Sequence, residues 1–509
     1  MSSANRTIRG RVLAGSLWLI ILRSISRVIG FTSTILLARL LVPEDFGLMA
    51  MAAVSMAFLE AFTTLNLGTV LIRNALSSRA DYDTAWTLQI LRGTLIAVVV
   101  LVGAPAIAGY FEEPRMIQIL PFVAAASFIN GFHNIGMVDL EKQFRFQSIV
   151  IKESLTRVTM VLLQVTLALV WRNYWALIAG IVCQSVVAVS LSYSFSPYRP
   201  RLSLARFAEI FGFGKWLTLS SITLFLMEQA DSLIIGRMLT PEILGLYVIG
   251  RNFITMPVNE LCGPVARVMF PAYAQIAHDP AALYRAMLMM LAAMVAVVAP
   301  ACAGLALISE PFVLVVLGAK WLPAADIMTI LAIGAIISTA SGVFSQILIV
   351  IGRPQLCVYT LAASLLVYVP ALIVGVGMAE APGAAAARAT IESLGFIAFF
   401  WITSRVMALR VRDVVAVVWR SLVAVAVMIG VVVWLRSTGG LFGAEGGLVL
   451  LLAQLVLAGA VSYGVVLLGL WLAQGRPVGA EEHVWEMMTR LAGHRRLAFL
   501  KRRLGSQQS

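Results

Sequence analysis

Two stretches of this sequence that lie 198 residues apart are nearly the same. Residues 36–48 read LLARLLVPEDFGL, and residues 234–246 read IIGRMLTPEILGL. Six of the thirteen positions are identical: Arg39 and Arg237, Leu41 and Leu239, Pro43 and Pro241, Glu44 and Glu242, Gly47 and Gly245, and Leu48 and Leu246. A shared helix start explains part of the match, because Thr240-Pro241-Glu242 supplies a capping hydroxyl, a proline and an acid near the positive dipole end. Trp18 and Trp216 keep the same offset, which favours an internal repeat over chance.

The composition around the repeat is that of a membrane protein. Of the 509 residues, 60% are hydrophobic and only 12% are charged, whereas a soluble domain carries about 25% charged residues. Apolar runs of about 20 residues recur along the whole chain, and each is long enough to cross a bilayer as a helix. A membrane β-barrel would instead alternate with a period of two. We therefore expect an all-α, polytopic membrane protein.

We expect about fourteen transmembrane helices, joined by short connections with no inserted soluble domain. They lie near residues 14–37, 46–72, 84–109, 116–138, 149–171, 174–195, 215–238, 243–268, 284–308, 326–351, 355–377, 383–404, 414–435 and 447–473. The repeat offset covers six of them, and an even number makes the two copies parallel, related by an axis along the membrane normal. The expected organisation is a cytoplasmic segment 1–13, a six-helix bundle 14–195, a cytoplasmic linker 196–214, a second six-helix bundle 215–404, two additional helices within 414–473 and a basic cytoplasmic tail 474–509.

The basic residues predict which side of the membrane each loop faces. Of the 38 Lys and Arg residues, we assign 26 to the segments and adjoining helix ends that share a side with both termini, six to the opposite loops and their adjoining helix ends, and six to the interior of spans. Basic residues are retained on the cytoplasmic side. Both termini are therefore expected in the cytoplasm, with the chain in the inner membrane.

The sequence offers no support for a cofactor, a metal site or nucleotide hydrolysis, since it contains no GxxxxGK[ST] loop, HExxH motif or pair of CxxC motifs. We expect the four cysteines to be free thiols packed within apolar spans. The net charge of +13 is explained by basic loops that set the membrane topology, so no nucleic-acid partner is expected.

Three segments carry a resemblance to a known family. They are GSLWLIILRSISRVIGFTSTILLARLLVPEDFGLMAMA with LNLGTVLIRN after it, FGKWLTLSSITLFLMEQADSLIIGRMLTPEILGLYVIGRN, and ALISEPFVLVVLGAKWLPAADIMTIL. Over roughly residues 10–410 the chain resembles bacterial polysaccharide-biosynthesis flippases of the Wzx type, within the multidrug/oligosaccharidyl-lipid/polysaccharide (MOP) exporter superfamily. The resemblance implies undecaprenyl-diphosphate-linked oligosaccharide as cargo, moved to the periplasmic leaflet for exopolysaccharide, O-antigen, lipopolysaccharide or capsule synthesis.

Ionisable residues inside spans are costly and mark candidate functional sites. Most of them fall in the first two helices of each predicted half. A polar cavity between the two halves is therefore expected. The candidate cargo-binding residues are Arg23, Arg27, Arg251, Asn252, Thr255, Asn259 and Arg388. Arginine suits a diphosphate because its forked donors bind two oxygens at once. The candidate ion-coupling residues are Glu228, Asp231 and Glu60, since two neighbouring buried acids raise one another's pKa.

A purely structural alternative remains open for these charges. Arg23 and Arg27 could pair with Glu228 and Asp231, and Arg388 stands four residues before Glu392, where the two can pair within one helix. Arg92 and Arg420 are expected to extend toward the cytoplasmic surface.

The function favoured by the sequence is ion-coupled flipping by alternating access, without enzymatic activity. A drug/cation antiporter of the same superfamily is the nearest alternative, although its cavity would be acidic rather than mixed. A polysaccharide polymerase would need a sizeable periplasmic loop, which the short connections do not provide. A non-catalytic component of an export complex would not need buried arginines. The expected partners are the lipid-linked cargo, membrane lipid and a polysaccharide polymerase complex.

Overall fold

The computed structural model describes residues 29–63, 67, 71, 78–143, 145–438 and 447–474. All regular secondary structure in these ranges is helical. Nine of the described helices are long and apolar enough to cross a membrane. The predicted all-α, multi-pass membrane class is therefore confirmed, while the count of fourteen spans and the symmetry of two bundles stay predictions.

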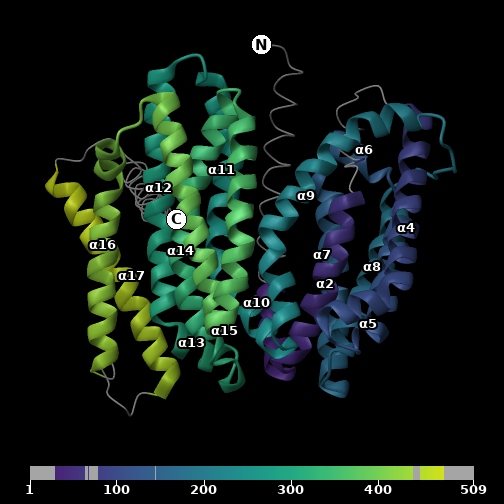
Figure 1. The fold of residues 1–509 in the computed structure, drawn as a ribbon, viewed down its shortest axis with the longest axis horizontal. Helices are drawn as coiled ribbons and strands as arrows, with labels where there is room; N and C mark the ends of the chain where they lie inside the picture. Colours follow the sequence, from purple (N-terminus) through teal and green to yellow (C-terminus); the bar gives the residue numbers. More distant parts are fainter. Residues whose placement is uncertain are drawn as a thin grey trace, which may run out of the picture. The chain divides into compact units, whose positions relative to one another are not determined.

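The chain divides into two compact units, and each is described by itself (Figure 1). The first unit extends to Val248 and also takes in Val316–Trp321. Its helices are Ile29–Leu40, α2 (Pro43–Thr63), α4 (Arg79–Phe111), α5 (Met116–Gly131), α6 (Met137–Lys142), α7 (Phe146–Trp171), α8 (Trp175–Phe195), α9 (Phe207–Met238), the first turns of α10 (Pro241–Pro257) and the 3-10 turn η2 (Ala319–Trp321).

Local sequence fixes where the long helix α4 begins and ends. At its start, the Ser78 backbone N–H donates to the Asp81 carboxylate at 2.7 Å, which forms one half of a capping box. At its end, Glu112 adopts the left-handed conformation with φ 53°. Between these caps α4 packs on α5, where a Cβ at Gly93 would lie 3.0 Å from the Ser127 carbonyl oxygen.

The second unit contains Ile249–Val315 and the chain from Leu322 onward. Its helices are the remainder of α10, the π-helix η1 (Val258–Cys262), α11 (Gly263–Ile276), α12 (Pro280–Leu307), α13 (Ser309–Val316), α14 (Ala324–Val350), α15 (Pro354–Met407), α16 (Val411–Ser437) and α17 (Gly447–Ala473). Its hydrophobic core includes Met287 of α12, Phe344 of α14 and Phe399 of α15, buried together with Met428 of α16 and Leu455 of α17.

The helix α15 is a hairpin of two helices, which the sequence predicts as separate spans near 355–377 and 383–404. The backbone leaves the helical conformation at Ala379 and Glu380, where Glu380 has φ 49°. Gly375 and Gly383 cross so closely that a Cβ on either would overlap the carbonyl oxygen of the other. Only glycine permits this approach of two backbones.

The contacts place α9 and the start of α10 in the first unit, although the repeat assigns both to the second predicted half. α9 packs along α2, and Figure 1 draws these two helices side by side within the first unit. A division by contact thus differs from a division by repeat, because helices that begin the second repeat are bound to helices of the first. The domain boundaries expected from the sequence follow the repeat, and they remain predictions.

Candidate functional site

The two copies of the repeat pack face to face within the first unit. A Cβ added to Gly47 would overlap the backbone carbonyl of Pro241, and a Cβ added to Gly245 would overlap the backbone carbonyl of Pro43. Each glycine of one copy therefore lies against the proline of the other. The identical Pro-x-x-x-Gly spacing of the two copies is what makes the contact reciprocal, and we call this contact the repeat junction.

An aromatic ring packs against the small residue that precedes each copy's arginine. In the first copy the indole N–H of Trp321 donates to the Ala38 carbonyl at 2.9 Å, and the Trp321 ring meets Phe46 edge-on at 5.2 Å. In the second copy, a Cβ at Gly236 would lie 2.8 Å from the ring of Phe111. Both small residues thus serve the same purpose, which is to let an aromatic ring approach the helix.

The repeated arginines bind different partners. Arg39 donates from Nε to the Val316 carbonyl oxygen at 2.9 Å. Arg237 donates to the carboxylate of Glu112, at the end of α4, at 2.5 Å. Lys320 adds a second cation to the first copy, donating to the Arg39 carbonyl at 3.0 Å and to the Leu41 carbonyl.

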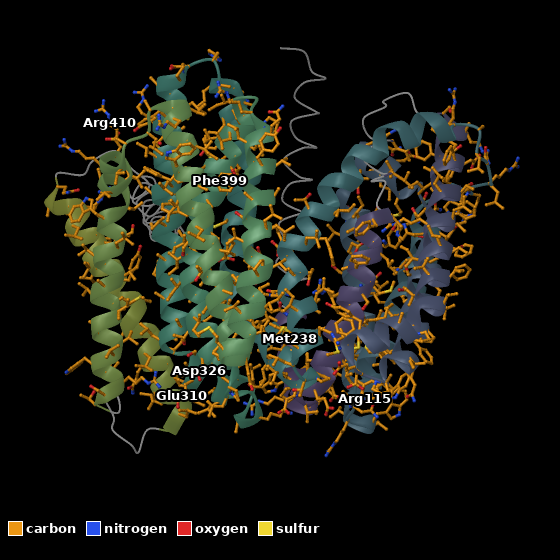
Figure 2. All side chains as sticks on the ribbon, in the orientation of Figure 1. Arg115, Met238, Glu310, Asp326, Phe399 and Arg410 are labelled. Atoms are coloured by element: carbon orange, nitrogen blue, oxygen red, sulfur yellow. The ribbon has the colours of Figure 1, made fainter. Side chains whose placement is uncertain are left out.

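A further ion-pair cluster lies at the same end of the unit. Arg115, labelled in Figure 2, binds Glu44 of the first copy at 2.6 Å and Glu113 at 2.7 Å. The hydrogen bond from Arg115 holds the pKa of Glu113 below its usual range, although partial burial opposes the shift. The start of α2, the end of α4 and the start of α5 are therefore connected through one guanidinium group.

The predicted coupling acids lie in different environments. Asp231 of α9 is fully buried and accepts hydrogen bonds from the Tyr247 hydroxyl at 2.8 Å and the Ser232 backbone N–H at 2.7 Å. Glu228, one turn earlier, and Glu60 of α2 are both exposed on the first unit. Tyr247 was missed by the sequence analysis, because a tyrosine sixteen residues after an acid carries no pattern that predicts contact.

The predicted cargo residues are only partly described. Arg23 and Arg27 lie outside the described residues. Arg251, Asn252, Thr255 and Asn259 belong to α10 and η1 of the second unit, and the Thr255 hydroxyl donates to the Arg251 carbonyl at 2.9 Å. Asn252 and Asn259 are exposed and Arg251 is half-buried. Asn259 falls in the π-helical turn η1, a distortion that is frequent at functional sites.

In the structure Arg388 pairs with Glu392 of the same helix, as the structural alternative for this residue predicts. Its Nε donates to the Glu392 carboxylate at 3.1 Å, and both side chains are mostly buried in the second half of α15. Arg420 also differs from its expected place at the surface. Only 6% of it is exposed, so the side chain is buried within the second unit and does not extend to the surface.

The opposite end of the first unit is held by the linker after α8. The Tyr198 hydroxyl and the Arg201 backbone N–H both donate to the Asp83 carboxylate, at 2.6 and 2.7 Å, and the Ser203 backbone N–H donates to Thr87 at 2.9 Å. Burial raises the pKa of Tyr198, and the carboxylate of Asp83 raises it further. The linker that precedes α9 is therefore bound to the start of α4.

The fold of this chain is similar to that of solved multi-spanning membrane proteins. The structure resembles the lipid II flippase MurJ in an inward closed conformation, with a TM-score of 0.73, 13% identity, and coverage of 90% of this chain and 100% of that one. It also resembles an inward-facing multidrug resistance MATE family transporter of the MOP superfamily, with a TM-score of 0.60, 13% identity, and coverage of 76% and 98%.

The sequence narrows this class to one family. The family described as polysaccharide biosynthesis protein matches residues 36–326, more than half of the chain, so the protein belongs to that family. The lipopolysaccharide biosynthesis protein WzxC of Escherichia coli is 24% identical over 422 residues, covering 81% of this chain and 85% of its own. The teichuronic acid biosynthesis protein TuaB of Bacillus subtilis is 24% identical over 411 residues, covering 79% and 84%. The resemblance noted from the sequence is thereby confirmed.

Proposed function

We propose that this protein translocates undecaprenyl-diphosphate-linked oligosaccharide from the cytoplasmic to the periplasmic leaflet of the inner membrane, without covalent chemistry. The observation that carries the proposal is the family match over residues 36–326 on a transporter fold. A further relative, the succinoglycan biosynthesis transport protein ExoT of Rhizobium meliloti, is 24% identical over 64% of this chain and is named a transporter. The product would pass to a polysaccharide polymerase complex.

The proposed orientation places both termini in the cytoplasm. The connections at the Arg115 end of the first unit would then be periplasmic, and the linker containing Tyr198 and Arg201 would be cytoplasmic. The support is the distribution of Lys and Arg along the sequence, together with the alternation of helix ends within the unit.

In this proposal arginines bind the cargo diphosphate. Arg23 and Arg27 share one helical face, and two guanidinium groups match the charge and the oxygen geometry of a diphosphate. Arg251 would contribute from α10, with Asn252, Thr255 and Asn259 meeting the sugar. Arg388 can join only if it exchanges Glu392 for the cargo, since that pair has a 3.1 Å hydrogen bond.

Coupling to an ion gradient would use the acids. Asp231 is the strongest candidate, because its carboxylate is fully buried and accepts a hydrogen bond from the Tyr247 hydroxyl at 2.8 Å. Glu228 and Glu60, being exposed on the first unit, are better placed to meet a cation from water. A drug/cation antiporter would use the same acids, so the cargo has to be tested directly.

The test is made in a bacterium that lacks the gene and is complemented with variants. We expect the deletion strain to lose surface polysaccharide and to accumulate lipid-linked repeat units, and the wild-type gene to reverse both. Arg23→Gln/Arg27→Gln should lower export at least about tenfold, equivalent to about 1.4 kcal/mol, while Lys at both positions retains part of it. The exposed Arg285→Gln serves as a matched control.

Combining Arg23→Gln/Arg27→Gln with Glu228→Gln/Asp231→Asn separates binding from pairing. If the arginines bind cargo, the neutral combination reaches the membrane at normal abundance but, once purified, no longer binds undecaprenyl diphosphate, whereas Glu228→Gln/Asp231→Asn alone keeps that binding even if lost coupling stops its export. Wild-type export by that combination would make the arginines structural, since removing both members of a buried pair leaves no stranded charge. Intact polysaccharide in the deletion strain together with lost drug resistance would assign the antiporter function instead.

A further inference from the structure

The first unit contains an apolar pocket of about 470 Å³ between α2, α4 and α9. Phe58 of α2 and Leu233 of α9 form two of its walls, and Gly103, Ile107 and Tyr110 lie along α4. Phe58 and Tyr110 remain 40% and 44% exposed, so the pocket opens to the surface of the unit. Its volume falls in the range of small-molecule sites, roughly 300–1,000 Å³.

The polar groups of the pocket are already bonded to protein. The Ser55 hydroxyl donates to the Met51 carbonyl at 2.8 Å, and the Tyr110 hydroxyl donates to the Leu233 carbonyl at 3.4 Å. Both hydroxyl protons are therefore already used, and the remaining side chains that line the pocket are aliphatic or aromatic. The chemistry of the walls selects a hydrocarbon.

The pocket follows α4 from Val99 to Phe111. Twelve residues of helix measure about 18 Å at ~1.5 Å per residue, which is close to half of the ~30 Å hydrocarbon core. Since Phe111 is at the end of α4 proposed to be periplasmic, the pocket lies at the depth of the outer leaflet. A hydrocarbon chain that has completed translocation would be at this depth.

A cationic side chain, that of Arg237, lies near the rim of the pocket. The guanidinium of Arg237 lies 6.0 Å from the centre of the Tyr110 ring and pairs with Glu112, and both charged side chains remain partly exposed. An anionic group at this position would bind Arg237 by displacing the Glu112 carboxylate, while the attached chain enters between Tyr110 and Phe58. Charge and apolar lining therefore match the two ends of an anionic lipid.

We propose that this pocket binds the polyprenyl tail of the lipid-linked cargo once it is in the outer leaflet, with the diphosphate held near Arg237. The proposal rests on the proposed function for the identity of the lipid. Gly103 and Ala106 leave room on α4 for the methyl branches of a polyprenyl chain, which make it wider than a straight acyl chain. The pocket would hold the product before release and so favour the outward step.

Substitutions at two glycines of α4 provide a matched test. A Cβ at Gly103 would meet no atom closer than the Ile107 Cδ1 at 3.9 Å, and a Cβ at Gly109 would meet nothing within 4 Å. Gly103 lines the pocket and Gly109 does not. The full-length purified protein in nanodiscs is titrated with undecaprenyl diphosphate, undecaprenol or phosphatidylglycerol, and binding is measured by native mass spectrometry.

We expect Gly103→Leu to weaken undecaprenyl diphosphate binding about tenfold, equivalent to about 1.4 kcal/mol, and Gly109→Leu to leave it unchanged. Arg237→Gln should weaken the diphosphate and not the alcohol. If Gly103→Leu accumulates poorly, Ala106→Phe fills the same space and decides the question. Unchanged binding in a folded pocket-filling variant would overturn the proposal, as would equal competition by phosphatidylglycerol, which would make the pocket a general lipid site.

The same variants distinguish this proposal from the proposed function. If the gene deletion leaves surface polysaccharide intact, the flippase function fails whatever the pocket binds. A second outcome is that the wild-type protein and Gly103→Leu restore export equally, with undiminished binding of undecaprenyl diphosphate by the variant. In that case the flippase function stands and the assignment of the pocket fails.

Discussion

The two copies of the repeated segment, 36–48 and 234–246, have the same backbone role and different surroundings. Both place a glycine against the proline carbonyl of the other copy, and both present a small residue to an aromatic ring. In the first copy Leu41, Pro43 and Asp45 are buried, whereas in the second Leu239, Pro241 and Ile243 are only half-buried.

The difference in burial follows from what each copy binds. The first copy is covered by the segment that carries Lys320 and Trp321, and its Glu44 joins the Arg115 cluster. The second copy is held by one ion pair, Arg237 with Glu112, which is exposed to solvent. Identical residues thus set the close approach of the backbones, and the partners that lie outside the repeat, such as Trp321 and Arg115, decide how firmly each copy is held.

The largest expected effect comes from breaking the contact that the copies share. Gly47→Ala and Gly245→Ala should each destabilise the protein by about 3 kcal/mol or more, since the new methyl group overlaps backbone that cannot move aside cheaply. The midpoint of thermal unfolding of detergent-purified, fluorescently tagged protein measures this. Gly109→Ala, on α4 with open space around it, should be neutral or slightly stabilising. Equal stability of Gly245→Ala and Gly109→Ala would show that the repeat junction is not tight in the protein.

A smaller effect should distinguish the first copy from the second. Trp321→Phe keeps an aromatic ring near Phe46 but removes the indole N–H that binds the buried Ala38 carbonyl, which should cost about 1–2 kcal/mol. The same thermal measurement applies, with the exposed Trp434→Phe as the control. A cost no greater than that of the control would contradict the view that Trp321 holds the first copy in place.

The smallest effect is expected at the ion pair of the second copy. Arg237→Gln should lower stability by less than about 1 kcal/mol, because both partners are exposed and the pair is screened by water. Raising the salt concentration should remove most of the difference between variant and wild type. A large cost that persists in high salt would mean that the second copy depends on Arg237 as strongly as the first copy depends on its buried contacts.

Sequence patterning predicted the helices well because a bilayer imposes length and apolarity on each span. The predicted span 447–473 coincides with α17, and 116–138 corresponds to α5, a turn and the short helix α6. The reversal at Ala379 and Glu380 falls between the two predicted spans 355–377 and 383–404. Pairing of Arg388 with Glu392 could be foreseen as an alternative, because it depends only on the helical repeat.

The candidate site was less accessible to sequence reasoning. Glu228 and Asp231 are three residues apart and look equivalent, yet one is exposed and the other is fully buried. The partner of Asp231 is Tyr247, sixteen residues away on the next helix. Arg420 shows the same limit, since its burial depends on which helices surround α16 and not on its distance from the end of the span.

The sequence by itself determined the all-α, membrane-spanning class and the existence of two related segments, because these depend on local apolarity and on identity at a fixed offset. Only the tertiary structure decided that the two segments meet, with Gly47 against Pro241 and Gly245 against Pro43. It also decided that α9 packs along α2. The physical reason is that close packing is specified by the fit of two surfaces. A glycine in the sequence shows that another part of the chain can pack closely at that position. Which part does so depends on the path of the whole chain.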